Sequence, residues 1–431
     1  MQLLPPAQHF KSLSELRKVI IEGYENFKLP LERQDINDHL FDPEPNTFEV
    51  VINKKKEKLL IPDARHYPFL FRGERKNYSP LPTLQRGKLT ETEIFVERMR
   101  QTEFEFLLKE HPVVKGFFRK HNFKIDFMGL AQHYGLKTDL LDFTSDFDIA
   151  LFFAMCPYNR DEDCYSYFKQ EGRKTAYLYV VLPALNFDLK KENFLESEVS
   201  VIGHQPFLRP GAQKGFSYQV RKGKPLNAVK YSFEYTSADS QKYYEKYQRG
   251  KELWIEDLLA DKTKLIQSKS QFSISIFNHT CKQYLPKGTS KNKLKKDLKL
   301  LKVDISTKNE NISFSPDENQ NIIKSWNKME IKKIRHSIRR RSWNQREQGS
   351  NIMKKYDFRT TSILLNMEML RLTGNRSGIE EYLKNQKTIP NQSTKIRKDN
   401  NVTWSSGWKY IPEAYVLAKS ETFLKEEDCL I

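Results

Sequence analysis

The residues that could do chemistry lie in short blocks between residues 71 and 216. Arg72 offers a planar fork of N–H donors that suits a pyrophosphate or a carboxylate. His133 could act as an acid or a base near neutral pH. Asp142 could hold a ribose or a catalytic water, and Gln213 could orient a ligand. We therefore predict an enzyme or ligand-binding site in which Arg72 holds an anionic group and His133, Asp142 and Gln213 surround it.

Each of these residues also has a structural interpretation. Arg72 could form a buried ion pair with Asp142, because buried charges need partners. His133 could be a hydrogen-bonded histidine of the core. Asp142 lies where a strand passes into a helix and could serve as a cap, and Gln213 could satisfy the strand that follows it. The residue types alone leave both interpretations open.

Several standard signatures of catalysis and metal binding are missing from the sequence. No P-loop, no GxGxxG after a strand, no HExxH and no GxSxG occurs. The nine histidines include no i,i+4 pair, and the four cysteines show no CxxC spacing. We predict no metal, and thiols that stay reduced.

Five blocks in a fixed order carry a resemblance to a known family. They are Phe71–Gly73 (FRG), Ala131–Leu136 (AQHYGL), Leu140–Thr144 (LLDFT), Ala150–Ala154 (ALFFA) and Pro206–Phe216 (PFLRPGAQKGF). Over about residues 65 to 220 the chain resembles the FRG domain family. The family's activity is not established, so the resemblance implies a domain rather than a reaction.

The chain departs from the family's usual residues at a few positions. Glu74 stands where Gln is usual, Lys137-Thr138-Asp139 where Pro-Thr-Arg is usual, and Phe143 where Trp is common. Arg72 is the first candidate for ligand binding. Four further candidates are Gly73, Gln132, Thr138 and Thr144.

A weaker similarity points to a ligand. An aromatic-Arg-Gly strand end, a second strand with hydroxyl side chains and a late Gln-x-Gly segment look like the order of site motifs in ADP-ribosyltransferases. This similarity implies NAD as the first cofactor or ligand to test. In that family a Glu of the third motif polarises the nicotinamide ribose, whereas this chain has Gln213 and Gly215 there. Fold-level likeness does not fix function.

The local sequence predicts which elements position these blocks. Capping signals predict helices after Ser12, after Thr90 and after Ser145 or Asp146, and Gly135 should end a helix that starts near Asp126. Strands are expected at 67–71, 138–143, 175–182 and from Gly215 onward, with a hairpin over 47–62. We predict an α+β fold with a small mixed or antiparallel sheet flanked by helices. The blocks 71–73, 132–144 and 213–216 should meet at strand ends in one site.

The second half of the chain is expected to be less regular. Alternation in QFSISIF, residues 271–277, predicts a strand, and 287–319 is rich in Lys, Asn and Ser, as in a loop or linker. The expected organisation has five parts. They are 1–64, an N-terminal helical extension and hairpin; 65–236, the FRG-like domain; 237–290, a mixed α/β continuation; 291–320, a linker or loop; and 321–431, a basic and largely helical C-terminal region.

The positive charge of the chain is concentrated rather than spread. The formal net charge is +18, and residues 281–346 contain 18 Lys or Arg against 6 Asp or Glu, a net charge of +12. Such a window could bind nucleic acid through phosphate contacts, or could simply be solvated. The residues proposed for nucleic-acid contact are Lys332, Lys333, Arg335, Arg339 and Arg340. Trp326 and Trp343 could stack on bases or anchor a core.

The hydropathy of the sequence bears on the cellular compartment of the protein. The mean hydropathy is −0.70, and no apolar run approaches the roughly 20 residues that cross a bilayer. The N-terminal residues lack the pattern of a secretory leader. We therefore expect a cytoplasmic protein without a membrane partner, whose partners would be a nucleotide or nucleic acid.

Overall fold

The computed structural model describes most of the first three quarters of the chain. The described residues are 5–32, 48–52, 58–62, 69–87, 89–120, 124–159, 162, 164–181, 199–202, 207–220, 226, 228–308, 310–327 and 416–417. The basic residues 332, 333, 335, 339 and 340, proposed above for nucleic-acid contact, and Trp343 lie outside them.

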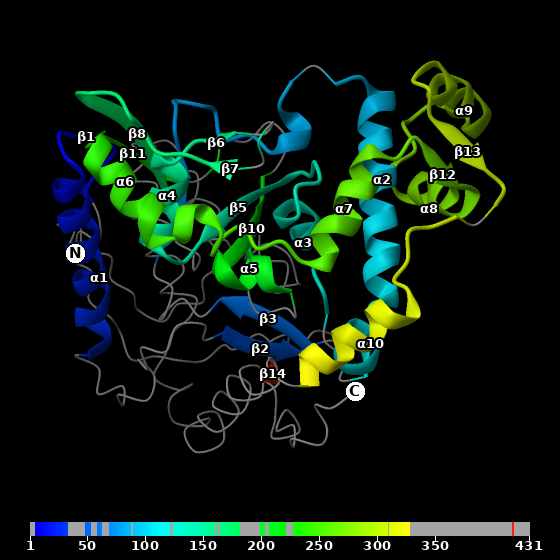
Figure 1. Cartoon of the computed structure of the whole chain (residues 1–431), viewed down its shortest axis with the longest axis horizontal. Coiled ribbons are helices and arrows are strands. Elements are labelled where there is room, and N and C mark those ends of the chain that lie inside the picture. Colours follow the sequence, from blue (N-terminus) through cyan, green and yellow to red (C-terminus); the bar gives the residue numbers. More distant parts are fainter. Residues whose placement is uncertain are drawn as a thin grey trace, which may run out of the picture.

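Within the described residues, a mixed sheet of seven strands forms the centre of the fold (Figure 1). Its order is β1-β11-β8-β4-β5-β10-β9, and only β1 and β11 run parallel. The strands are β1 (His9–Phe10), β4 (Leu70–Glu74), β5 (Leu140–Thr144), β8 (Arg173–Val181), β9 (Val199–Val201), β10 (Gly215–Gln219) and β11 (Val229–Thr236). The expected α+β class with a mixed sheet flanked by helices is confirmed.

Helices cover both faces of this sheet, and the side chains of β8 show why. Leu178 and Val180 point into one hydrophobic core, while Tyr179 and Val181 point into the other, because strand side chains alternate between faces. The first core contains residues of α1 (Leu13–Glu32), α4 (Phe147–Met155) and α6 (Ser237–Lys246). The second contains residues of α2 (Glu91–Glu110), α3 (Phe127–His133) and α7 (Leu258–Ser268). Both faces are therefore buried around the candidate blocks.

Helix starts follow the capping signals in the sequence. Thr90 and Glu93 form the expected capping box of α2, in which the Glu93 amide donates to the Thr90 hydroxyl and the Glu93 carboxylate accepts from the Thr90 amide. The Asp146 carboxylate caps α4 by accepting from the amides of Asp148 and Ile149. α3 ends before Gly135, whose φ of +89° is the left-handed conformation that glycine adopts most readily.

A smaller unit packs against the first half of α2, and here the local sequence was misleading. The expected strand at 271–277 is wrong after Ser273, because the Ser273 hydroxyl caps α8 (Ile274–Tyr284) by accepting from the Ile276 amide. The expected loop at 287–319 is also wrong. It contains α9 (Lys291–Leu300), β13 (Asp304–Ser306) and the start of α10 (Pro316–Ser325). Leu294 and Leu298 of α9 are buried in a core that α2 and α8 share, so tertiary burial decides this segment.

The remaining elements are short. The hairpin expected at 47–62 is present as β2 (Phe48–Ile52) paired antiparallel with β3 (Lys58–Pro62), and β14 (Val416–Leu417) pairs with β2. The others are β6 (Tyr158–Asn159), β7 (Cys164–Tyr165), β12 (Gln271–Ser273), α5 (Leu208–Ala212), the single turns η2 (Thr83–Gln85) and η5 (Gln248–Gly250), and the π-helical η3 (Val114–Arg119).

Candidate functional site

The candidate site lies where β4 and β5 meet. β4 pairs with β8 along its whole length, and β5 pairs with β10 along its whole length, but β4 and β5 share the single register pair Phe71 and Thr144. Beyond that pair a side chain joins the two strands, because Nη1 of Arg72 donates to the backbone carbonyl of Asp142 at 2.9 Å. The FRG and LLDFT blocks are thus in direct contact.

The guanidinium of Arg72 has its main partner in Glu74. Its Nε and Nη2 donate to Oε1 of Glu74 at 2.9 and 2.6 Å, and the two side chains are only 15% and 13% exposed. Within the described residues, three of its five N–H groups are therefore engaged. Arg72 and Glu74 are two apart on a strand and so share a face, which is a sequence signal that could have identified the pair. Arg72 contacts the backbone of Asp142 rather than its carboxylate.

A buried glutamine fixes the ring of His133. Nε2 of Gln213 donates to the carbonyl of Leu253 at 2.9 Å, so the Gln213 oxygen, Oε1, faces Nδ1 of His133 at 3.1 Å. A carbonyl oxygen can only accept, so Nδ1 carries a proton. In the neutral imidazole the other nitrogen, Nε2, is then a bare acceptor.

A second glutamine fixes the carboxylate of Asp142. Oε1 of Gln132 accepts hydrogen bonds from the hydroxyls of Thr138 and Thr83, at 2.5 and 3.3 Å. This turns Nε2 of Gln132 toward Asp142, where it donates to Oδ2 at 3.1 Å. Gln132, Asp142, His133 and Gln213 therefore form one chain of four side chains, drawn from α3, β5 and the turn before β10.

The middle link of this chain lacks a hydrogen bond. Nε2 of His133 lies 3.5 Å from Oδ1 of Asp142, and among the described residues neither atom has a hydrogen-bond partner, although both are buried. The His133 side chain is 1% exposed, while that of Asp142 is 34% exposed. Two facing acceptors need a proton on one of them or a donor from elsewhere. The pair can therefore hold a proton or accept the hydroxyl of a ligand.

Two glycines of the blocks, Gly73 and Gly215, allow close approaches. A Cβ on Gly73 would lie 1.9 Å from the carbonyl oxygen of Ala150, so α4 can pack on β4 only where a glycine stands. A Cβ on Gly215 would lie 2.5 Å from Cε1 of His133. Gly73 is thus placed against a helix, and Gly215 lies under the imidazole.

The two threonines among the candidate ligand residues use their hydroxyls to bind backbone amides. The hydroxyl of Thr144 accepts from the amide of Asp146 at 3.1 Å, next to the start of α4. Thr138 is fully buried, and its hydroxyl accepts from the amide of Leu140 at 3.1 Å while donating to Gln132. A ligand role for Gly73, Thr138 and Thr144 stays a prediction.

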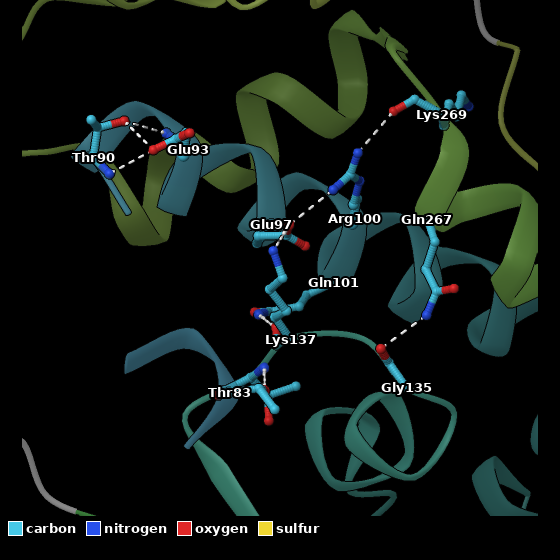
Figure 2. A network of polar contacts seen from close by, with 11 residues as sticks. Thr83, Thr90, Glu93, Glu97, Arg100, Gln101, Gly135, Lys137, Gln267 and Lys269 are labelled. Atoms are coloured by element: carbon cyan, nitrogen blue, oxygen red, sulfur yellow. Dashed lines mark hydrogen bonds and ion pairs between the residues drawn. The ribbon is translucent and has the colours of Figure 1, made fainter. Parts of the chain in front are cut away.

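Residues 134–139 connect α3 to β5, and side chains of α2 and α7 bind this connector, as Figure 2 shows. Glu97 of α2 accepts from Nζ of Lys137 at 3.1 Å, and Nε2 of Gln101 donates to the Lys137 carbonyl. Gln267 of α7 donates to the carbonyl of Gly135 at 2.9 Å. Asp139, where the family usually has Arg, forms an ion pair with Arg98 of α2. These contacts fix the backbone that places His133 and Asp142 beside each other.

The sequence analysis did not identify two residues near the site, Arg86 and Tyr78. Arg86 follows η2, is 43% exposed, and has Nη2 3.9 Å from Oε1 of Glu74. Burial, followed by the neighbouring Arg72 charge, lowers the pKa of Arg86. Tyr78 is 47% exposed. Apart from the position of Arg86 in the turn-rich segment after FRG, the sequence carries no signal for either residue.

The fold and the site define an α+β domain in which three sequence-distant blocks surround a buried histidine–aspartate pair. The family model of the FRG domain matches residues 67–163, so the chain contains an FRG domain. The match includes four of the five blocks, and Gln213 lies beyond it. No curated protein and no solved structure matches the chain significantly. Nothing in these comparisons supports the likeness to ADP-ribosyltransferases.

Two further observations concern metals and membranes. Within the described part of the chain, no three His, Cys, Asp or Glu side chains are grouped so that they could hold a metal ion. Among the helices that the structure describes, none has the length and apolar character that a membrane crossing needs.

Proposed function

We propose that the FRG domain binds a nucleotide, with NAD as the first candidate, and that a ligand hydroxyl donates to the facing acceptors of His133 and Asp142. The observation that supports this is that Nε2 of His133 and Oδ1 of Asp142 are buried 3.5 Å apart and have no hydrogen-bond partner in the part of the chain that the structure describes. Leaving such groups without a partner costs about 1 to 3 kcal/mol each. A ribose hydroxyl would supply the missing hydrogen.

The surroundings of the pair suit a preorganised acceptor. Gln213 fixes the proton on Nδ1 of His133, and Gln132 fixes the carboxylate of Asp142. Neither residue needs to reorient when a hydroxyl arrives, so little binding energy is lost in ordering the site. His133 could then take the hydroxyl proton as a general base, with the Asp142 carboxylate stabilising the resulting imidazolium.

ADP-ribosyl transfer is one reaction that such a nucleotide site could serve. Gly215 stands where ADP-ribosyltransferases carry a Glu. Gln213, two residues earlier, has both ends of its amide already bound, to His133 and to the Leu253 carbonyl. This favours a positioning role for Gln213. Ligand binding is accordingly the part of the proposal that the geometry supports best.

Calorimetric titration with NAD, ADP and AMP tests the proposal, and Asp142→Asn is the informative variant. If the Asn oxygen keeps its bond from Gln132, its amide group faces Nε2 of His133 and donates to it. The pair is then satisfied without a ligand. We expect affinity to fall about tenfold or more while the melting temperature stays the same or rises.

Asp261→Asn is the matched control, because Asp261 is exposed on α7 and the change removes the same charge. It should leave the affinity unchanged. Absence of binding to every nucleotide tried, or an Asp142→Asn variant that binds as tightly as the wild type, would contradict the proposal.

Nucleic-acid binding is a second candidate, supported by one described surface. α9 is anchored through Leu294 and Leu298, and its remaining faces carry the exposed lysines 291, 293, 296 and 299. Phosphate contacts release counterions, so log affinity should fall linearly with log salt, at about 0.9 per contact on duplex DNA. The triple change of lysines 293, 296 and 299 to Gln should reduce that slope. Trp326 does not support this function, because it is 2% exposed and packs near Phe118.

A further inference from the structure

The segment that follows β4 crosses the candidate site and is tied to it. The hydroxyl of Thr83 bonds Oε1 of Gln132 at 3.3 Å, and the amide of Leu84 donates to the carbonyl of Thr138 at 3.1 Å. Thr83 and Leu84 belong to η2, and Arg86 follows directly. The residues on either side of η2 are therefore held at a fixed distance from Asp142 and His133.

Arg86 is a cation whose Nη donors have no hydrogen bond among the described residues. Its Nε donates to the Leu81 carbonyl at 2.7 Å, which fixes the direction of the guanidinium. Among the described residues, its Nη atoms have only the 3.9 Å contact with Glu74. That carboxylate oxygen already accepts two N–H groups of Arg72 at 2.6 and 2.9 Å.

Two guanidinium groups thus share one carboxylate oxygen. Partial burial, followed by the neighbouring charge of Arg72, acts against the charged form of Arg86 and lowers its pKa, although the carboxylates of Glu74 and Asp142 act in the opposite direction. Arginine nevertheless stays protonated. An anion placed on the Nη donors of Arg86 would relieve this repulsion.

Tyr78 places an aromatic ring at the same edge. Its backbone carbonyl accepts from the hydroxyl of the buried Tyr179 at 2.9 Å, so the backbone is fixed while the side chain is 47% exposed. The Arg86 guanidinium binds the carbonyl of Leu81, three residues after Tyr78, so both side chains belong to the same held segment. An exposed aromatic ring on a fixed backbone is a stacking surface for a planar base.

We propose that Arg86 binds the phosphate and Tyr78 stacks on the base of a phosphorylated nucleoside, so that this segment sets the specificity of the site. The inference rests on the proposed function, in which the His133–Asp142 pair receives the ribose hydroxyl. It assigns the anion-binding role to Arg86 in place of Arg72, whose fork is largely taken by Glu74 and the Asp142 carbonyl.

Titration of the full chain with AMP and with adenosine tests the assignment. The wild type should bind AMP more tightly than adenosine. Arg86→Gln should weaken AMP binding by about tenfold or more and leave adenosine binding within about twofold, because only the charge-assisted bond to phosphate is lost. Tyr78→Leu should weaken the binding of both ligands, whereas Tyr78→Phe should retain both.

Arg75→Gln is the matched control, since Arg75 is exposed in the same segment and the change removes the same charge. It should leave the ratio of the two affinities unchanged. The inference is overturned, with the proposed function intact, if Arg86→Gln binds both ligands with the wild-type ratio. Failure of the wild type to bind either ligand, or any other nucleotide tried, overturns the proposed function and this inference together. A melting curve for each variant shows whether a loss of binding reflects unfolding.

Discussion

The imidazole of His133 lies directly against the backbone of Gly215. A Cβ on Gly215 would stand 2.5 Å from Cε1 and 2.9 Å from Nε2 of the ring, closer than real Cβ contacts. Gly215 is the first residue of β10, and Gln213, two residues earlier, binds Nδ1 of the same ring. One short segment therefore both orients the histidine and makes room for it.

Gly215→Ala should displace the His133 ring and break its bond to Gln213. We expect the free energy of unfolding to fall by about 1 to 3 kcal/mol, the usual cost of overpacking, and nucleotide binding to be lost. Urea unfolding and calorimetric titration measure the two effects. Wild-type binding by this variant would show that the position of the ring does not matter for the ligand.

Gly73→Ala tests whether the glycine of the FRG tripeptide is needed for packing. Its Cβ would meet the Ala150 carbonyl at 1.9 Å and the Ala154 Cβ at 2.9 Å, so β4 and α4 must separate. We expect a loss of about 3 kcal/mol or more in urea unfolding, at the high end of overpacking costs. Gly288→Ala is the comparison, because that residue has open space but a φ of +77°, so backbone strain alone should cost about 1 kcal/mol. Equal losses in both variants would refute the packing role.

Arg72→Lys separates a structural role of Arg72 from a ligand-binding one. Lysine keeps the charge but cannot bind Glu74 and the Asp142 carbonyl together, so the free energy of unfolding should fall by about 1 to 3 kcal/mol. Glu74→Gln should cost less, because the amide oxygen still accepts from Arg72. Thermal melting gives both values. Unchanged melting of Arg72→Lys together with lost nucleotide binding would instead make Arg72 a ligand clamp.

His111 should make stability depend on pH. It is buried between the rings of Phe207 and Phe314, and burial lowers its pKa to about 3. Below about pH 6.5 the unfolded chain binds a proton at this residue and the folded chain does not. The free energy of unfolding should therefore fall as the pH drops from about 6.5 toward 3, by up to about 1.4 kcal/mol per unit from this residue.

The variant His111→Gln isolates this contribution, since glutamine does not titrate. It should be less stable than the wild type at pH 7 because the aromatic packing is lost, but its stability should change less between pH 6.5 and 5. Urea midpoints at several pH values measure the difference. Parallel pH profiles for the two proteins would mean that His111 does not titrate on unfolding.

Local signals in the sequence were sufficient for many elements around the site. The capping box at Thr90 and Glu93 and the cap at Asp146 start α2 and α4 where expected, because caps act through bonds to amides a few residues away. The β-branched and aromatic run at 175–182 predicts a strand, and β8 spans Arg173–Val181 and pairs with both β4 and β11. The order of the blocks in the sequence likewise identified the FRG domain.

Local signals failed where burial overrode them. Residues 271–277 alternate like a strand, yet α8 begins at Ile274, because its helical face fits the core beside Phe95 and Leu294. The Lys-rich stretch after Lys287 reads as a loop, yet Leu294 and Leu298 are enough to hold α9 against that core. Periodicity over seven residues cannot reveal which partner surface is available.

The sequence by itself determined which residue types are present, and it predicted Arg72 and Asp142 at strand ends. That placement is wrong, because each lies at the middle of a five-residue strand, Arg72 in β4 and Asp142 in β5. Only the tertiary structure decided their partners. Gln213 meets His133 across 80 positions of sequence, and Arg72 meets the Asp142 carbonyl across 70, because β5 is paired to β4 on one side and to β10 on the other. Hydrogen bonds act over about 3 Å, so which donor meets which acceptor depends on the pairing of distant strands, and no local pattern encodes that pairing.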